Sequence, residues 1–298
     1  MRRFFSIASL LLIAFNVLGQ EHSHEVPCFT DEILAKAIEK NPDLLRKQME
    51  HEDHLYNTLN AANKRSTAGC DVRIIPTVFH IIHNNGSENI SAKTVNDYIE
   101  KVNKVWRFQN IDLDDIDTLW HNSVIDMQVE LRLAKLDENG DSTDGIVRVQ
   151  STQTVNAGDG IKSLSQWDPD KYLNIYVVRS IGGAPAGSQI LGYAYFPWME
   201  SATQPPGIVM RSDVLNRATL SHELGHYLDL YHPFQSGCGT SCATTGDRVC
   251  DTPPVEEAPA GEDTPSPEPE AGADEPQPSE SESAAVDATD ETDAPQVS

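Results

Sequence analysis

The stretch from His222 to His232 reads HELGHYLDLYH and contains three histidines and one glutamate. His222 and His226 are four residues apart, so a helix would place both imidazoles on one face, where they can reach the same metal ion. Zinc binds histidine nitrogen readily and prefers four ligands in a tetrahedron. Glu223 directly follows the first histidine, and its carboxylate could accept a proton from a water whose pKa zinc lowers to about 7. The pattern therefore predicts a hydrolytic zinc site.

The third histidine requires the chain to change direction. His232 lies six residues after His226, which in an unbroken helix is roughly 240° around the axis. The helix must therefore end near Leu228, and residue 229 must take a positive φ. Glycine does this most freely, whereas aspartate and asparagine do so more readily than other side chains. Asp229 is thus a tolerable turn residue with some strain, and we expect His232 to be the third ligand.

Two other interpretations of the motif stay open. A surface helix with two histidines at this spacing also occurs by chance. Alternatively, a downstream glutamate such as Glu256 or Glu257 supplies the third ligand, as in thermolysin-type enzymes. A His232→Ala variant that keeps its zinc would favour the glutamate.

The elements that must position the motif follow from hydrophobic periodicity. Apolar residues at helical spacing predict helices over Asp31 to Lys40 and Pro42 to Asn60. Ser91 is expected to cap a long amphipathic helix that ends near Phe108, and a second long helix starts near Asn216 and contains the motif. Alternating or β-branched runs predict strands over Val72 to His83, Met127 to Leu136, Ile146 to Val149, Leu173 to Val178, Gly192 to Phe196 and Ile208 to Arg211, the last two near a sheet edge. This order predicts an α/β domain with a mixed sheet.

Composition divides the 298 residues into four regions. Residues 1–19 begin with two arginines and continue with an apolar run, which is typical of a cleaved export signal. Residues 20–68 are helical and polar and are interpreted as a pro-segment, with an ordinary helical subdomain as the alternative. Residues 69–254 form the expected catalytic domain. Residues 255–298 are predicted to be a disordered acidic tail, because they lack large apolar side chains.

The net charge of −24 is unevenly spread, since the 14 acidic residues from Val255 onward leave −10 for the rest of the chain. A nucleic-acid partner would need a basic face, so we expect none. No segment after the export signal is long and apolar enough to span a membrane. Export predicts a secreted protein in an oxidising compartment, where disulfides persist. The five cysteines are an odd number, so at least one is unpaired within the chain.

The motif and its surroundings resemble a known family. HELGHYLDLYH is similar to the extended zinc motif H-E-x-x-H-x-x-G-x-x-H of the metzincin proteases. Four further stretches narrow the resemblance to pappalysin-type members: IIPTVFHIIHNNG at 74–86, WDPDKYLNIYVV at 167–178, LGYAYFP at 191–197 and GDRVCDTPP at 246–254. The resemblance extends from about Cys70 to Pro254.

This resemblance implies a metzincin-like catalytic domain, with a mixed twisted sheet and two long helices, the second of which carries the zinc motif. It implies one zinc ion per chain, bound by His222, His226 and His232, with Glu223 as the general base. The implied function is a secreted zinc-dependent metalloendopeptidase that hydrolyses peptide bonds in proteins or peptides. Its substrate would lie extended along an edge strand of the sheet.

Secreted relatives are made as zymogens, so the resemblance also implies an activating protease. In some of them a pro-segment cysteine ligates the zinc and blocks water, and Cys28 is the cysteine within the expected pro-segment. The alternatives for Cys28 are a disulfide with Cys70 or a spare thiol. Relatives can also bind calcium after the zinc motif, where Asp247 and Asp251 are candidate oxygen donors.

One departure from the family concerns the region after the third histidine. Metzincins have a methionine-containing turn below the zinc, followed in pappalysins by a tyrosine, whereas the last methionine here is Met210 and the last tyrosine is Tyr231. The sequence thus lacks the C-terminal methionine-turn region. This motivates a second hypothesis, in which the chain is a truncated, inactive zinc-binding pseudoprotease that acts as a binding module.

Overall fold

The computed structural model describes residues 24–26, 28–62, 71–110, 116, 118, 121, 124–199, 201, 205–215, 217–235 and 245–249. Residues 24–26 and 28–62 are called the N-terminal segment below. Several predictions fall outside the described residues and stay predictions: the export signal at 1–19, the acidic tail at 255–298, and the pairing of Cys70, Cys238, Cys242 and Cys250.

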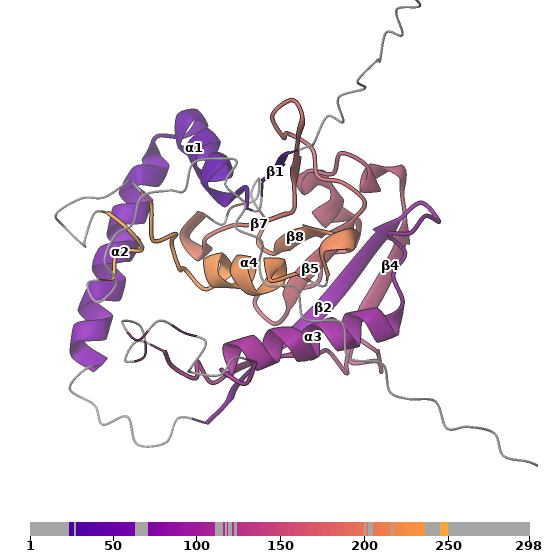
Figure 1. The fold of residues 1–298 in the computed structure, drawn as a ribbon, viewed down its shortest axis with the longest axis horizontal. Coiled ribbons are helices and arrows are strands. Elements are labelled where there is room, and N and C mark those ends of the chain that lie inside the picture. Colours follow the sequence, from indigo (N-terminus) through magenta and orange to yellow (C-terminus); the bar gives the residue numbers. More distant parts are fainter. Residues whose placement is uncertain are drawn as a thin grey trace, which may run out of the picture. The chain divides into compact units, whose positions relative to one another are not determined.

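A mixed six-stranded sheet lies at the centre of the described fold (Figure 1). Its order is β3 (Val129–Leu133), β2 (Arg73–His83), β5 (Leu173–Val178), β8 (Ile208–Arg211) and β7 (Gly192–Ala194), and β4 (Ile146–Gln150) also pairs with β2. The pairs are parallel except that β7 runs antiparallel to β8. The expected mixed α/β architecture is confirmed, with β7 as an edge strand.

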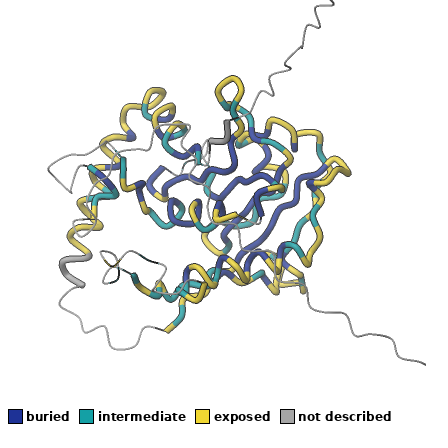
Figure 2. The backbone as a smooth tube through the Cα atoms, viewed as in Figure 1, coloured by how far each residue is buried: buried dark blue, intermediate teal, exposed yellow. Residues whose placement is uncertain are grey.

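The long strand β2 joins the two halves of the sheet. On one side it pairs first with β3 and then with β4, and on the other side it pairs with β5. From Thr77 to His83 every residue of β2 is buried, as expected for a parallel strand covered on both faces. Figure 2 shows that the central strands are buried over most of their length, whereas the loops and outer helix faces are exposed.

Helices α3 (Ala92–Trp106) and α4 (Thr219–Tyr227) pack on the same face of the sheet (Figure 1). Ser91 caps α3 as predicted, because its side chain accepts a hydrogen bond from the Thr94 N–H at 3.0 Å. The apolar stripe of α3 shares one core with β2, β5 and α4. From α3 this core contains Val95, Ile99, Val102 and Trp106, and from α4 it contains Leu220 and Leu224. This core supports α4 from the sheet side.

Helix α4 is shorter than the sequence predicts. We expected a long helix from Asn216, but α4 has nine residues and begins at Thr219. The Tyr98 hydroxyl of α3 fixes this start, because it donates to the Arg217 carbonyl at 3.2 Å and accepts from the Leu220 N–H at 3.1 Å. It satisfies a first-turn N–H that has no partner within the helix. Tyr98 lies 122 residues from Leu220, so no local pattern reveals this contact.

The N-terminal segment contains the two predicted helices, α1 (Thr30–Lys40) and α2 (Asp43–Ala62). Their apolar side chains pack against the chain after β7 and against Tyr231; this cluster consists of Leu34, Ala37, Leu44, Tyr195, Phe196, Trp198, Met199 and Tyr231. Burying one leucine contributes about 1.5–3 kcal/mol, so this cluster holds the segment firmly. Among the described helices, none is long and apolar enough to cross a bilayer.

A small second sheet was not predicted. Strand β1 (His24–Val26) pairs in parallel with β6 (Ser188–Ile190). Each strand has three residues, too few for a hydrophobic pattern, and each forms only by pairing with the other. Beyond β1, the Phe29 N–H donates to the Gly192 carbonyl at 3.1 Å. The N-terminal segment thus runs along residues 188–192 and brings Cys28 next to β7.

Candidate metal centre

Helix α4 presents two histidines on one face. The Nε2 atoms of His222 and His226 are 3.1 Å apart, as their spacing predicts. His226 is buried, whereas His222 is exposed. The centre is therefore open to solvent on the His222 side and closed on the His226 side.

A turn brings the third histidine back to this face. The Leu230 N–H donates to the Gly225 carbonyl at 2.9 Å, directly after α4. Asp229 has a φ of 74°, the left-handed conformation that the sequence predicts for this position. His232 Nε2 then lies 3.0 Å from that of His222 and 3.1 Å from that of His226. The structure brings the three predicted histidines together.

Hydrogen-bond partners indicate which nitrogen of each buried ring carries the proton. His226 Nδ1 faces the Leu230 carbonyl oxygen at 2.8 Å, and His232 Nδ1 faces the Asp31 carboxylate at 2.9 Å. Both partners accept hydrogen bonds, so Nδ1 is the protonated nitrogen and each Nε2 turns its lone pair to the centre. Two lone pairs 3.1 Å apart repel each other unless a cation lies between them.

A proton is a poor candidate for that cation near neutral pH. Burial, together with the neighbouring His232 and His222, lowers the pKa of His226 to about 3. Neutral imidazole is the form that binds metals. With zinc–nitrogen bonds of about 2.0–2.1 Å, ligand nitrogens in a tetrahedron lie about 3.3 Å apart, close to the observed 3.0 to 3.1 Å. The donor set fits a zinc ion.

Cys28 completes a group of four potential ligands. Its Sγ lies 3.3 Å from His226 Nε2, and the ligand atoms of Cys28 and the three histidines all lie within 4.8 Å of one another. The Thr30 N–H donates to this sulfur at 3.4 Å. Burial raises the pKa of the thiol, and the Glu223 charge raises it further, whereas a nearby cation favours the thiolate. Cys28 is a free cysteine, so it is available as a ligand.

Glu223 lies fully buried beside this group. Its Oε2 accepts a hydrogen bond from the Thr30 hydroxyl at 3.3 Å, while Oε1 has no hydrogen-bond partner. Burial raises the pKa of Glu223 to about 8. A Cβ atom on Gly192 would lie 3.2 Å from Oε1, so glycine at this point of β7 leaves room for the carboxylate. The unpaired oxygen is available to accept a proton from a reacting water.

The N-terminal segment covers the edge strand next to these residues. In addition to the bond from Phe29 to Gly192, the Ala194 N–H donates to Thr30 Oγ1 at 3.1 Å. Thr30 is fully buried. Free main-chain groups on an edge strand are where an extended peptide pairs. Residues of the segment thus occupy the position that we expected for a substrate.

The described residues give no support to the expected calcium site. Asp247 Oδ1 accepts a hydrogen bond from the Val249 N–H at 2.9 Å, within its own turn. Asp251 lies outside the described residues. Within the described part of the chain, the group that could hold a metal consists of Cys28, His222, His226 and His232.

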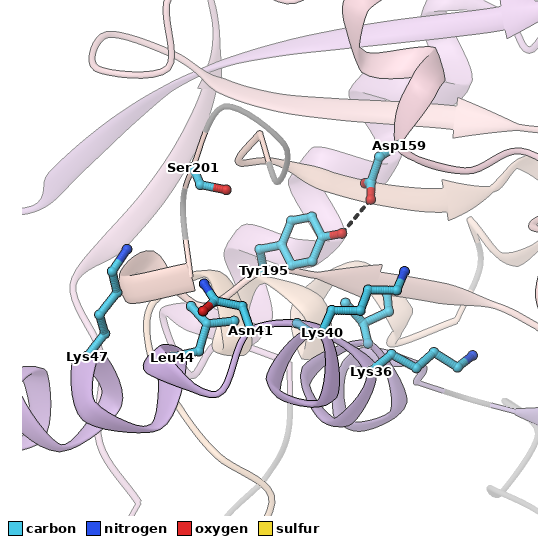
Figure 3. Close-up of a pocket in the computed structure, with 10 residues that line it drawn as sticks. Lys36, Lys40, Asn41, Leu44, Lys47, Asp159, Tyr195 and Ser201 are labelled. Atoms are coloured by element: carbon cyan, nitrogen blue, oxygen red, sulfur yellow. Dashed lines mark hydrogen bonds between the residues drawn. The ribbon is translucent and has the colours of Figure 1, made fainter.

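A cavity of about 490 Å³ lies between the N-terminal segment and the chain that follows β7 (Figure 3). Lys36 and Lys40 of α1 and Lys47 of α2 line it on one side. On the other side, the Tyr195 hydroxyl donates to the Asp159 carboxylate. None of the three histidines lines this cavity, so it is separate from the metal centre.

The fold and the four potential ligands are those expected of a metzincin-type metalloprotease, and comparisons with known proteins support this class. The Peptidase M43 model, described as pregnancy-associated plasma protein-A, matches residues 158–264. An extracellular metalloprotease of Colletotrichum graminicola is 35% identical over 142 residues, or 39% of this chain and 46% of that protein. One of Pyricularia oryzae is 38% identical over 104 residues, or 30% of this chain and 33% of that protein. The chain matches less than half the length of these relatives.

Two solved structures are similar as well. A promirolysin mutant of Tannerella forsythia shares the fold, with a TM-score of 0.62 and 24% identity over 75% of each chain. Mature mirolysin in complex with a cleaved peptide has a TM-score of 0.53 and 28% identity over 61% of this chain and 72% of its own. The resemblance seen in the sequence is confirmed: residues 158–264 match the pappalysin family model, and the fold is similar to that of mirolysin.

Sequence reasoning singled out the histidines, Glu223 and Cys28 but missed Thr30 and Asp31. Both residues begin α1, where a hydroxyl and a carboxylate are ordinary helix-start residues. Their partners at the centre lie 193 and 201 residues away. The available signal was their position two and three residues after Cys28.

Proposed function

We propose that this chain is a secreted zinc-dependent metalloendopeptidase, made as a zymogen, that hydrolyses peptide bonds in proteins. The observation that carries the proposal is the convergence of three histidine Nε2 atoms, 3.0 to 3.1 Å apart, beside the buried Glu223. The family match and the relatives named extracellular metalloproteases support the same class of protein and its secretion.

Each residue of the centre has a distinct proposed role. His222, His226 and His232 would hold zinc, which supplies Lewis acidity and polarises the scissile carbonyl. Glu223 accepts a proton from the attacking water and passes it to the leaving amine. A positive charge next to Glu223 lowers the pKa that burial raises, so the carboxylate is ionised and able to act as a base at neutral pH.

The edge strand β7 would hold the substrate. An extended peptide pairs with an edge strand through main-chain hydrogen bonds. The Gly192 carbonyl and the Ala194 N–H are two such groups, and both are now bonded to the N-terminal segment. Substrate binding therefore requires this segment to leave.

Residues 20–68 would act as the pro-segment, with Cys28 as the latency switch. The Cys28 sulfur lies 3.3 Å from His226 Nε2, within the space that a reacting water would need. Thr30 occupies the neighbouring position between Glu223 and Ala194. A Cys28→Ser variant should show measurable peptidase activity before the segment is removed. Unchanged latency in that variant would instead make Cys28 a spare thiol.

The proposal is tested with the full chain loaded with zinc. A protease specific for basic pairs would cleave at Lys64-Arg65, and hydrolysis of an unfolded protein would then be followed. We expect hydrolysis that both a chelator and Glu223→Ala abolish. A zinc-loaded chain that cuts nothing would favour the alternative of an inactive binding module, and a Glu223→Ala variant that cuts at the original rate would contradict the mechanism.

A further inference from the structure

The turn from Asp229 to His232 is contacted by both helices of the N-terminal segment. Asp31 of α1 lies 2.9 Å from His232 Nδ1, and His51 of α2 lies 2.6 Å from the Asp229 carboxylate. We propose that α1 and α2 hold this turn in the form that presents the third ligand, so that the segment assembles the metal centre as well as covering it. The inference rests on the proposed function and deepens it.

Asp31 acts at the ligand itself. A carboxylate on the second nitrogen of a metal-binding histidine fixes the tautomer and the ring orientation. His232 is 8% exposed, so its ring has few other partners for Nδ1. When the Gln235 amide is oriented to donate, its nitrogen lies 2.8 and 3.1 Å from the two Asp31 oxygens. One carboxylate from α1 thus orients the ligand and ties down the residues that follow it.

Helix α2 holds the beginning of the turn. The His51 and Asp229 side chains are 25% and 13% exposed, so their contact is largely shielded from water. Gln48, one turn before His51, donates to the Tyr231 hydroxyl at 3.2 Å, and that hydroxyl donates at 3.2 Å to Glu52, the residue after His51. A single face of α2 therefore contacts two residues of the turn.

Arg248, which follows the motif in the sequence, also takes part in the contact between α2 and the turn. Its guanidinium pairs with Glu52 and lies over the Tyr231 ring, 4.7 Å from the centroid. The contact between α2 and the turn is thus a connected polar network. Networks of this kind hold one arrangement of their members, because breaking one bond leaves the other groups unsatisfied.

The same contact explains why an aspartate stands at residue 229. Glycine would take a φ of 74° with less strain, but it has no carboxylate for His51. The second oxygen, Asp229 Oδ1, is buried without a hydrogen-bond partner. When α2 leaves, the carboxylate loses its bond with His51, and the turn loses a contact that holds its first residue in place. We therefore expect zinc to load best while the segment is still attached.

The test uses the full chain and two measurements. Zinc affinity is measured by competition with a chromophoric chelator, and hydrogen exchange of the Asp229 and Leu230 amides is measured on the metal-free chain. Asp31→Ala should lower the zinc affinity about 10- to 100-fold, the usual effect of removing such a partner. His51→Gln should speed exchange of the two amides about tenfold, as expected for loss of a hydrogen bond to a carboxylate.

Matched controls lie on the same helices. Glu32 of α1 and His54 of α2 are exposed neighbours of the tested residues, so Glu32→Gln and His54→Gln should leave both measurements unchanged. Asp229→Asn keeps a residue that tolerates positive φ but removes the charge. If the His51 and Asp229 side chains interact directly, the double variant His51→Gln with Asp229→Asn should exchange no faster than the faster single variant.

Each outcome decides one of the two proposals. Equal zinc affinity for Asp31→Ala and Glu32→Gln, with equal exchange for His51→Gln and His54→Gln, overturns the inference. If the zinc-loaded and processed chain still cuts protein in that case, the proposed function stands. If the chain binds zinc and shows the expected effects but never cuts, the proposed function fails and the inference stands. If no zinc binds, the exchange measurement on the metal-free chain still decides whether α2 holds the turn.

Discussion

The two sides of the metal centre are built in different ways. His222, Glu223 and His226 lie on α4, which rests on the central sheet and α3 through one continuous core. His232 lies on a turn that α1 and α2 contact through Asp31, His51 and Glu52. The helix side of the centre, with His222, Glu223 and His226, is positioned by residue spacing within α4 and by the core beneath that helix. The turn side, with His232, is positioned by contacts from a segment that is far away in sequence. We therefore expect that the centre can be loosened at His232 while the domain stays folded.

The largest effect is expected when a ligand of the helix side is removed. His226→Ala should reduce zinc binding to well below one ion per chain and lower peptidase activity by about 10³-fold or more, because metal-ion catalysis supplies several kcal/mol. Metal analysis and a cleavage assay check this, with the exposed His54→Ala as the control. If the His226→Ala variant kept its full zinc content, the turn side rather than the helix side would contribute most to zinc binding.

The sheet beneath the helix side should lose stability in acid. His80 is fully buried, with Nε2 2.8 Å from Asn174 Oδ1 and Nδ1 2.9 Å from the Ser165 hydroxyl. Burial lowers its pKa to about 4. A histidine with a depressed folded pKa contributes stability that is complete above about pH 6.5 and is lost as the pH falls toward 4, here about 3 kcal/mol.

Urea unfolding between pH 4 and 7 measures this loss. His80→Gln keeps one donor and one acceptor without the titration, so its unfolding free energy should fall less steeply with decreasing pH. Parallel pH profiles for the two proteins would show that other groups cause the acid sensitivity.

The turn side should respond to backbone conformation. Asp229→Val places a β-branched residue at a φ of 74° and should cost about 1–3 kcal/mol of unfolding free energy. Asp229→Gly also loses the contact with His51 but takes this φ without strain. Denaturant unfolding should therefore rank the glycine variant above the valine variant. Equal stabilities would mean that the left-handed turn is not required.

The smallest effect is expected at the start of α4. Tyr98→Phe removes the hydroxyl that bonds Arg217 and Leu220, and it should lower the unfolding free energy by about 1 kcal/mol. Tyr56 of α2 is 68% exposed, so Tyr56→Phe is a suitable control. An unchanged stability for Tyr98→Phe would show that the helix start needs no partner from α3.

The same contrast separates what the sequence could and could not predict. The spacing of His222 and His226, the need for positive φ at Asp229, and the strands of the central sheet all follow from local patterns, and the structure agrees with them. Cys28 was named through the resemblance, and the structure brings it to the histidines. The pairing of β1 with β6, the contact of Tyr98 with α4 and the bond from Asp31 to His232 were missed. Each of these joins residues more than a hundred positions apart, and each involves side chains or short strands without a distinctive local pattern.

The left-handed turn at Asp229 also has a consequence for how such chains can change over time. Codons for aspartate, asparagine and glycine are related by single-nucleotide steps through aspartate, and all three residues accept positive φ better than most others. A gene can therefore exchange these residues one mutation at a time and keep the third histidine in place. What changes is the side chain at residue 229 that His51 can bond. The strength of the contact between α2 and the turn can therefore vary in evolution independently of the metal ligands.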